Sequence, residues 1–240
     1  MAELKQYLSK KEKIGYGLGD MASNLYFQTF VVFMPIFYTD VFGLAPAAMG
    51  TMMLFSRFWD AANDPLMGMI ADRTDTKWGK FRPYIAGFAI PIGLAGFLAF
   101  NTPNFGASGN LIYAYVTYIL LMMMYTGVNV PYAALMGVIT PNSAERTSVS
   151  QYRFAFAFIG QFIAGAVTLG LVEYFGSGNE AIGWRMVMVL YGIVAAALLF
   201  GTFSLTKERV LPKVSKQNRI KDDLKNLMKN KPWILMGLAT

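Results

Sequence analysis

The sequence has no cysteine and no histidine among its 240 residues. Without cysteine it cannot form disulfide bonds or thiolate metal sites. Without histidine it has no imidazole ligand, no Ser-His catalytic pair and no side chain that ordinarily titrates near neutral pH. Charged residues are also scarce, at 15% of the chain. Any proton or cation chemistry must therefore use carboxylates, and we expect no cofactor.

Apolar residues are abundant, at 55% of the chain, and they occur in long uninterrupted blocks. The mean hydropathy of +0.40 agrees with this pattern. Together they predict an all-α membrane protein with several spans. The formal net charge is +7, but the Lys and Arg residues lie in short segments between apolar runs. Membrane topology explains that placement, so we exclude nucleic-acid binding.

Six apolar runs can be drawn, followed by a seventh that begins at Pro232 and continues to Thr240. The six runs are Ile14–Val41, Pro46–Ala71, Tyr84–Asn101, Leu111–Ile139, Val149–Phe175 and Trp184–Leu205. We therefore expect a six-helix transmembrane domain over residues 1–206, a basic linker over 207–231 and the start of a seventh helix over 232–240. Residues 1–13 are polar, with four lysines and no short apolar core, so we expect no removable signal peptide.

Lys and Arg residues are concentrated in alternate connections. Four precede the first run, four lie in Asp72–Arg82 and nine lie in Lys207–Lys231, whereas the connections 42–45, 102–110 and 176–183 have none. This asymmetry predicts that the N-terminus and Lys207–Lys231 face the cytoplasm. The expected location is the cytoplasmic (inner) membrane of a bacterial-type cell, with membrane lipids as partners.

The second run places charged side chains inside the membrane. As a helix it is about 36 Å long, enough to cross a hydrocarbon core about 30 Å thick. At 100° per residue, Arg57, Asp60 and Asp64 fall within about 60° of one another, so all three can face one polar cleft while Met53 and Phe58 face elsewhere. Charged side chains at this depth are usually functional. The structural alternative is an Arg57–Asp60 ion pair with Asp64 near the cytoplasmic boundary.

Polar side chains also occur in the first, fourth and fifth runs. In the first run Asp20 and Asn24 are one helical turn apart and form a polar stripe. In the fourth run Tyr125 and Asn129 share a face, and Arg153 lies early in the fifth. The structural alternatives are close helix approach at the glycines beside Asp20, a proline kink near Asn129, and an Arg153 that extends to the lipid headgroups.

The second and third runs are joined by a charged connection, Asp72-Arg73-Thr74-Asp75-Thr76-Lys77-Trp78-Gly79-Lys80-Phe81-Arg82-Pro83. Its mixed charges, its glycine and its helix-starting proline predict a tight turn that makes ion pairs with neighbouring helix ends. A plain solvated loop is the alternative.

Four motifs, in order and at consistent spacing, carry a family resemblance. They are Tyr38-Thr39-Asp40, Arg57-Phe-Trp-Asp60-Ala-Ala-Asn63-Asp64-Pro65, Trp78-Gly-Lys-Phe-Arg-Pro83 and Asn129-Val-Pro-Tyr132. Over essentially its whole length the chain closely resembles the glycoside–pentoside–hexuronide:cation symporters of the major facilitator superfamily, which include the melibiose permeases.

The resemblance implies the N-terminal six-helix half of a twelve-helix cation-coupled symporter that alternates between inward-open and outward-open states. It implies a small sugar or glycoside as substrate and Na⁺ or H⁺ as the coupling ion. The missing C-terminal half would be the partner, so the chain would be a truncated reading frame or a partial piece that does not transport alone.

Residue by residue, the resemblance assigns roles to positions of this chain. The cation-binding residues are Asp60, Asp64, Asn63 and Thr126, with Asp60 and Asp64 as Na⁺ ligands if sodium is the coupling ion. The sugar-binding residues are Asn24, Asn129, Arg153, Tyr125 and Asp20. Arg57 is expected to pair with a carboxylate, and Asp72, Arg73, Lys80 and Arg82 are expected to form a conformational loop.

Two departures from the melibiose permeases narrow the match. Those permeases have aspartates where this chain has Asn24 and Asn129, so the pattern is more similar to the hexuronide and pentoside or xyloside branches. Two alternatives from other classes stay open. Gly17-Leu18-Gly19-Asp20 matches the Gly-x-Gly-Asp pattern of intramembrane aspartyl proteases, and a membrane assembly subunit would have its polar cleft packed shut.

Overall fold

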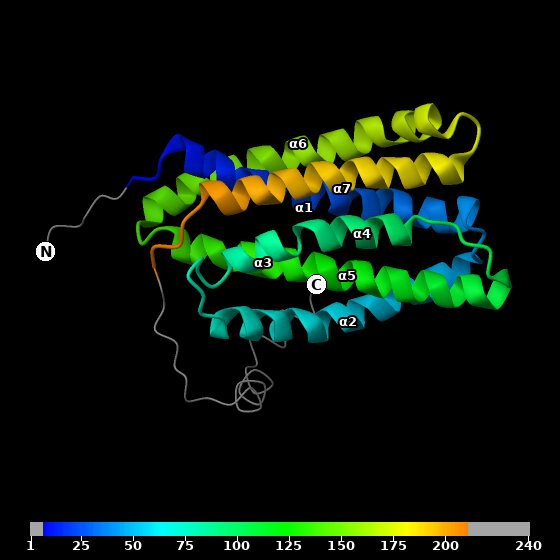
Figure 1. Cartoon of the computed structure of the whole chain (residues 1–240), viewed down its shortest axis with the longest axis horizontal. Helices are drawn as coiled ribbons and strands as arrows, with labels where there is room; N and C mark the ends of the chain where they lie inside the picture. The colour runs from blue at the N-terminus through cyan, green and yellow to red at the C-terminus, as the bar shows by residue number, and fades with distance from the viewer. Residues whose placement is uncertain (1–6, 211–240) are drawn as a thin grey trace, which may run out of the picture.

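The computed structural model describes residues 7–210, and this part of the chain is entirely helical apart from its connections. The helices run side by side along the long axis of the molecule (Figure 1). They are α1 (Lys10–Ile36), the π-helical turn η1 (Phe37–Val41), α2 (Pro46–Arg73), α3 (Arg82–Gly87), α4 (Ala89–Ala99), α5 (Gly106–Ile139), α6 (Ser143–Gly176) and α7 (Glu180–Leu205). The linker from residue 211 onward and the expected seventh helix at 232–240 lie outside the described residues.

Five of the six apolar runs each correspond to one main helix, and the third is divided. The expected run Tyr84–Asn101 forms α3 and α4, which meet at Phe88. Pro91 accounts for the division, because it has no N–H to donate to the carbonyl of Gly87 and its ring would collide with that carbonyl in a continuous helix. α6 and α7 are preceded by the N-cap residues Asn142 and Asn179, whose side chains accept backbone N–H groups of the first turn.

Three of the described helices, α5, α6 and α7, are long and apolar enough to cross a membrane. α1 and α2 are also long enough, at 27 and 28 residues. Because of their polar and charged side chains, α1 and α2 are less apolar than an ordinary span. α4 is apolar but has only 11 residues. Length and composition therefore identify three spans, and the polar side chains of α1 and α2 need another explanation.

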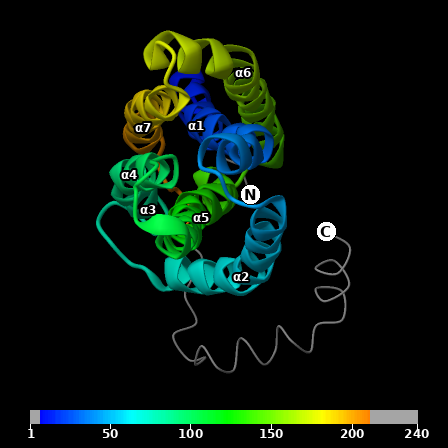
Figure 2. The same ribbon diagram turned by 90° about the vertical axis from the view of Figure 1, so that its right-hand side faces the viewer.

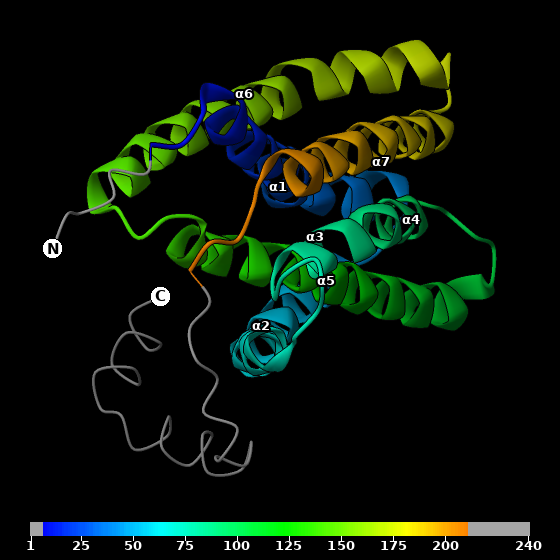
Figure 3. The ribbon, with the colours of Figure 1, turned by 60° about the vertical axis from the view of Figure 1, so that its left-hand side comes forward.

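The helices form two groups, which Figures 2 and 3 show from the end and from the side. In one group α1 packs against α6 and α7, and in the other α5 packs against α2, α3 and α4. The groups are joined mainly where α4 meets α7. There a Cβ added at Gly93 would lie 3.1 Å from Cα of Gly192, so a larger residue would push the two helices apart by a few tenths of an ångström. On the other side, α1 faces α2 and α5 with few contacts.

Candidate functional site

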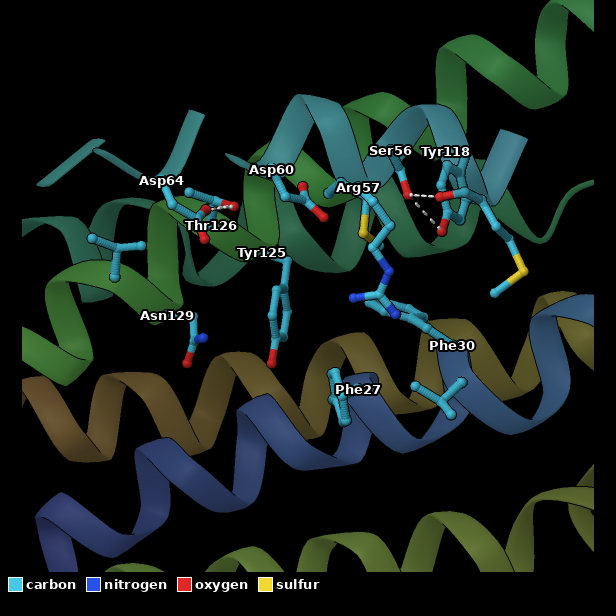
Figure 4. Close-up of a pocket in the computed structure, with 14 residues that line it drawn as sticks. Phe27, Phe30, Ser56, Arg57, Asp60, Asp64, Tyr118, Tyr125, Thr126 and Asn129 are labelled. Carbon is cyan, nitrogen blue, oxygen red and sulfur yellow. Dashed lines mark hydrogen bonds between the residues drawn. The ribbon is translucent and has the colours of Figure 1, made fainter. Parts of the chain in front are cut away.

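A cavity of about 240 Å³ lies where α1 of one group faces α2 and α5 of the other. Figure 4 shows its labelled side chains projecting from these three helices into one space. The lining residues are Phe27, Phe30 and Val31 of α1, Met53, Ser56, Arg57, Asp60 and Asp64 of α2, and Tyr118, Met122, Tyr125, Thr126, Asn129 and Val130 of α5. The structure thus brings together Arg57, Asp60 and Asp64, as their helical spacing predicts.

The two carboxylates differ in their partners. Asp64 accepts a hydrogen bond from the Thr126 hydroxyl at 2.9 Å, which joins α2 to α5 (Figure 4). One turn earlier, Asp60 has a carboxylate oxygen, Oδ1, that is buried and accepts no hydrogen bond among residues 7–210. A buried carboxylate oxygen without a donor is costly, so it favours a cation or a proton in its place.

Arg57 does not form the expected charge pair. No carboxylate of residues 7–210 lies within ion-pair distance of its guanidinium, and the side chain extends from α2 toward Phe30 of α1 (Figure 4). The Arg57–Asp60 ion pair proposed as the structural alternative is therefore wrong for this part of the chain. The acidic pair lacks a direct cationic partner, which leaves it available to a cation from outside.

The structure contradicts the expectation that Met53 faces away from the cavity and confirms it for Phe58. Met53 lines the cavity, because it lies one turn before Arg57 on the same face, whereas Phe58 is 70% exposed and points away. Asn63 does not line the cavity. It follows Asp60 by three residues but lies 100° from Asp64, toward the flank of the helix. The structure therefore groups Asp60, Asp64 and Thr126 but leaves Asn63 beside them.

The expected sugar-binding residues are divided between two places. Tyr125 and Asn129 line the cavity next to the acidic pair, and Phe27 stacks on Tyr125 with ring centroids 6.3 Å apart. Asn24 and Arg153 do not line it. The expected set is therefore divided between the cavity and the neighbouring contact of α1 with α6, and its role in sugar binding stays a prediction.

The second polar group lies at the contact of α1 with α6. Arg153 donates from Nε to the carboxylate of Asp20 at 3.0 Å, and the Asp20 side chain is only 6% exposed. Asn24 donates to the backbone carbonyl of Asp20 at 2.8 Å and accepts from Gln161 at 2.7 Å. Arg153 therefore pairs with the buried Asp20 within the helix bundle instead of extending to the headgroups.

A tyrosine pair beside Asp20 was not identified from the sequence. Tyr16 of α1 and Tyr132 of α5 stack with centroids 4.6 Å apart, and each hydroxyl donates to the other residue's backbone carbonyl, at 3.1 and 2.8 Å. A Cβ at Gly19 would lie 2.5 Å from the Tyr132 ring. Close helix approach at this glycine, the alternative raised by the sequence, is therefore confirmed, and it fixes α1 against α5 beside the cavity.

The connection between α2 and α3 is ordered by a residue that the sequence did not single out. Glu208, after α7, accepts the backbone N–H groups of Lys80, Phe81 and Arg82 at 2.8 to 3.0 Å. Arg82 donates to the carbonyls of Phe203 and Trp78, and Lys80 Nζ donates to the carbonyl of Asp72 at 3.4 Å. The predicted tight turn is present. Arg82 contacts the neighbouring helix α7 through hydrogen bonds to the Phe203 carbonyl and not through an ion pair.

Two ion pairs join helix ends at the same end of the bundle. Arg209 binds both carboxylate oxygens of Glu12, and Lys13 lies 3.0 Å from the carboxylate of Glu145. Glu145 also accepts the N–H of Leu8 at 2.9 Å. Glu12 and Glu145 lie in the first turns of α1 and α6, where an acidic residue is ordinary, so their long-range pairs have no signature in the sequence.

The arrangement of the cavity suits a monovalent cation or a proton. Within residues 7–210, no group of three or more His, Cys, Asp or Glu side chains could hold a metal ion. Two carboxylates with a hydroxyl beside them offer oxygen ligands, which hard cations prefer. Tyr125 and Asn129 supply an aromatic face and an amide, which can contact a hydroxylated ligand next to that cation.

Comparison with known proteins agrees with this geometry. Residues 15–239 match the family described as MFS/sugar transport protein. The chain is 45% identical over 229 residues to the putative glycoside/cation symporter YagG of Escherichia coli, covering 95% of the chain and 50% of that protein. It is 42% identical over 236 residues to the inner membrane symporter YicJ of the same species, covering 98% and 51%.

A third relative is the isoprimeverose transporter of Lactiplantibacillus pentosus, 38% identical over 235 residues, with 97% of the chain and 49% of that protein covered. The chain spans about half the length of the curated relatives it matches. These relatives are transporters and not enzymes, so the intramembrane protease alternative is wrong. The family match and the relatives together show that the chain belongs to the MFS/sugar transport family of glycoside and cation symporters.

Proposed function

We propose that this chain forms the N-terminal half of a cation-coupled symporter for a sugar, glycoside, pentoside or hexuronide. The observation that carries the proposal is the buried Asp60 Oδ1 without a donor, in a cavity that Asp64, Thr126, Tyr125 and Asn129 also line. A non-transporting assembly subunit would have this cleft packed shut, and a cavity of about 240 Å³ disfavours it.

In this proposal the cation binds between Asp60, Asp64 and the Thr126 hydroxyl, with Asn63 beside the site on the flank of α2. Two carboxylates in a space of low dielectric repel each other, so the empty site is unstable. Either Na⁺ or H⁺ relieves that repulsion. Binding at the cation site therefore changes the charge of the wall that the sugar meets.

The sugar binds next to the cation, against Tyr125 and Asn129. Asn24, Asp20 and Arg153 form the adjoining polar group on α1 and α6, and they reach the sugar in the assembled transporter. The cavity volume is below the 300 to 1,000 Å³ typical of small-molecule sites. A second six-helix half therefore supplies the remaining wall. By linkage, cation and sugar raise each other's affinity by the same factor.

The proposed membrane arrangement is a six-span domain over 1–206, a cytoplasmic linker over 207–231 and the start of a seventh span over 232–240. α1, α2 and the pair α3 and α4 then cross the membrane, with their polar side chains directed to the cavity and to one another. The ion pairs at one bundle end and the basic residues there support a cytoplasmic N-terminus in the inner membrane. Asp72, Arg73, Lys80 and Arg82 form a loop that shifts during transport.

Replacing Thr126 with Ala tests the cation site with little change in shape. The Thr126 hydroxyl donates to Asp64 and so holds a proposed Na⁺ ligand in place, and losing a hydrogen bond that orients a ligand typically costs about 10- to 100-fold in metal affinity. We expect Na⁺ affinity to fall by about tenfold or more in a sugar-uptake assay of the full transporter at graded Na⁺ concentration. Thr126→Ser keeps the hydroxyl and is expected to retain near-normal affinity. An equal loss in both variants would show that the hydroxyl is not the relevant group.

A further inference from the structure

A second pocket of about 290 Å³ lies at one end of the bundle, between the connection that precedes α3 and the residues that follow α7. Its charge is unbalanced. Four cationic side chains line it, from Lys77, Lys80, Arg82 and Lys207, against the two carboxylates of Asp75 and Glu208. The pocket is separate from the cation and sugar cavity, because the two share no lining residue.

Within residues 7–210, no carboxylate lies within ion-pair distance of Lys77, Arg82 or Lys207, so the charge of these three side chains stays available. Both oxygens of the Glu208 carboxylate accept backbone N–H groups at the start of α3, so they are directed to the protein backbone. Arg82 donates to neutral carbonyls of Trp78 and Phe203, and its guanidinium lies 4.7 Å from the centroid of the Phe203 ring. Lys77 and Lys207 are exposed at the rim.

The position of the pocket along the bundle matches the depth of lipid headgroups. α7 is one of the three apolar spans, and it ends at Leu205, two residues before Lys207. Trp78 is 53% exposed, and its ring lies nearly perpendicular to the Phe203 ring, with centroids 6.1 Å apart. Exposed tryptophan and basic side chains at the end of an apolar helix are typical of the membrane–water interface.

We propose that this pocket binds a phosphate group, supplied by the headgroup of an anionic phospholipid. The net positive lining selects a negative ligand, and the interfacial depth places the phosphate layer of the bilayer beside it. Lys77 and Lys207 contact the phosphate from the rim, and Arg82 supplies a fixed charge behind them. Each basic residue near an anionic surface contributes an attraction equivalent to about fivefold in affinity.

The test compares lipid binding by the 240-residue chain and by two doubly substituted chains. Lys77→Gln with Lys207→Gln removes the rim lysines. Lys10→Gln with Lys11→Gln removes the same charge from exposed positions at the start of α1 that do not line the pocket. Native mass spectrometry in detergent measures how much phosphatidylglycerol, an anionic lipid, each chain retains. Phosphatidylcholine, a zwitterionic lipid, is the comparison, and inorganic phosphate is added as a competitor.

We expect phosphatidylglycerol binding to fall about 25-fold in the rim variant and to stay within about twofold in the control. Equal losses in both variants would overturn the pocket in favour of diffuse attraction. Equal retention of phosphatidylcholine would overturn the requirement for an anionic headgroup. Displacement by millimolar inorganic phosphate beyond that by NaCl of equal ionic strength would assign the pocket to a free anion. If the rim variant does not fold, Lys77→Gln alone is expected to show the fivefold loss.

Discussion

Replacing Asp60 with Asn in the full transporter is expected to abolish cation-driven accumulation of sugar. Asp60 has a buried oxygen without a donor, and Asn keeps its shape but removes its charge and offers one oxygen in place of two. Losing a charge-assisted contact of about 1.5 to 3 kcal/mol weakens cation binding by about tenfold to a hundredfold. Uptake down a sugar gradient is expected to survive, because Tyr125 and Asn129 are unchanged.

The matched control is Glu173→Gln, which removes the charge of an exposed carboxylate on a spanning helix away from the cavity. It is expected to accumulate sugar normally. The measurement is uptake of a labelled glycoside panel with imposed Na⁺ or H⁺ gradients. The imposed gradients also distinguish Na⁺ from H⁺, because only the gradient of the coupling ion drives accumulation in the unsubstituted protein. Undiminished uphill accumulation by Asp60→Asn would contradict the proposed coupling site.

Replacing Arg153 with Met is expected to give the largest loss of stability. It leaves the carboxylate of Asp20, whose side chain is 6% exposed, without its cation. Removing one partner of a buried pair typically costs 3 to 5 kcal/mol, and about 3 kcal/mol is expected because the Arg153 side chain is 35% exposed. By the scaling of globular domains of this size, Tm falls by roughly 5 to 10 °C.

The double variant Asp20→Asn with Arg153→Met distinguishes a buried pair from simple packing. Because Asn leaves no uncompensated charge, the double variant is expected to regain most of the lost Tm. Arg146→Met, on the same helix and without an ion pair in residues 7–210, serves as the control and is expected to change Tm little. Thermal unfolding of the purified chain measures all three. A double variant no more stable than Arg153→Met would show that the charge pair is not the cause.

The fold was predictable where the chain has a strong periodic signal. Long apolar runs located the helices to within a few residues, and helical spacing placed Asp60 and Asp64 on one face because both lie on a single helix. The position of Thr126 opposite Asp64 came from the family resemblance. Spacing within one helix cannot predict which face of another helix it meets.

The features that sequence reasoning missed depend on contacts between distant segments. Glu208 accepts N–H groups more than 120 residues earlier in the chain, and Tyr16 and Tyr132 are 116 residues apart. Neither pair has a local signature. The division of the third run at Phe88 did have one, since Pro91 lies four residues after the carbonyl of Gly87. The pairing of Arg153 with Asp20 depends on how α6 packs against α1.

The most direct test of the central claim uses the absence of cysteine from this chain. Single cysteines at Asp60 and Asp64 are exposed in turn to a water-soluble thiol reagent in membranes, with Phe58→Cys on the opposite face of α2 as the comparison. We predict rapid labelling at both carboxylate positions and slow labelling at Phe58, because the acidic face of α2 borders a hydrated cavity. Slow labelling at Asp60 and Asp64, with fast labelling at Phe58, would contradict the account.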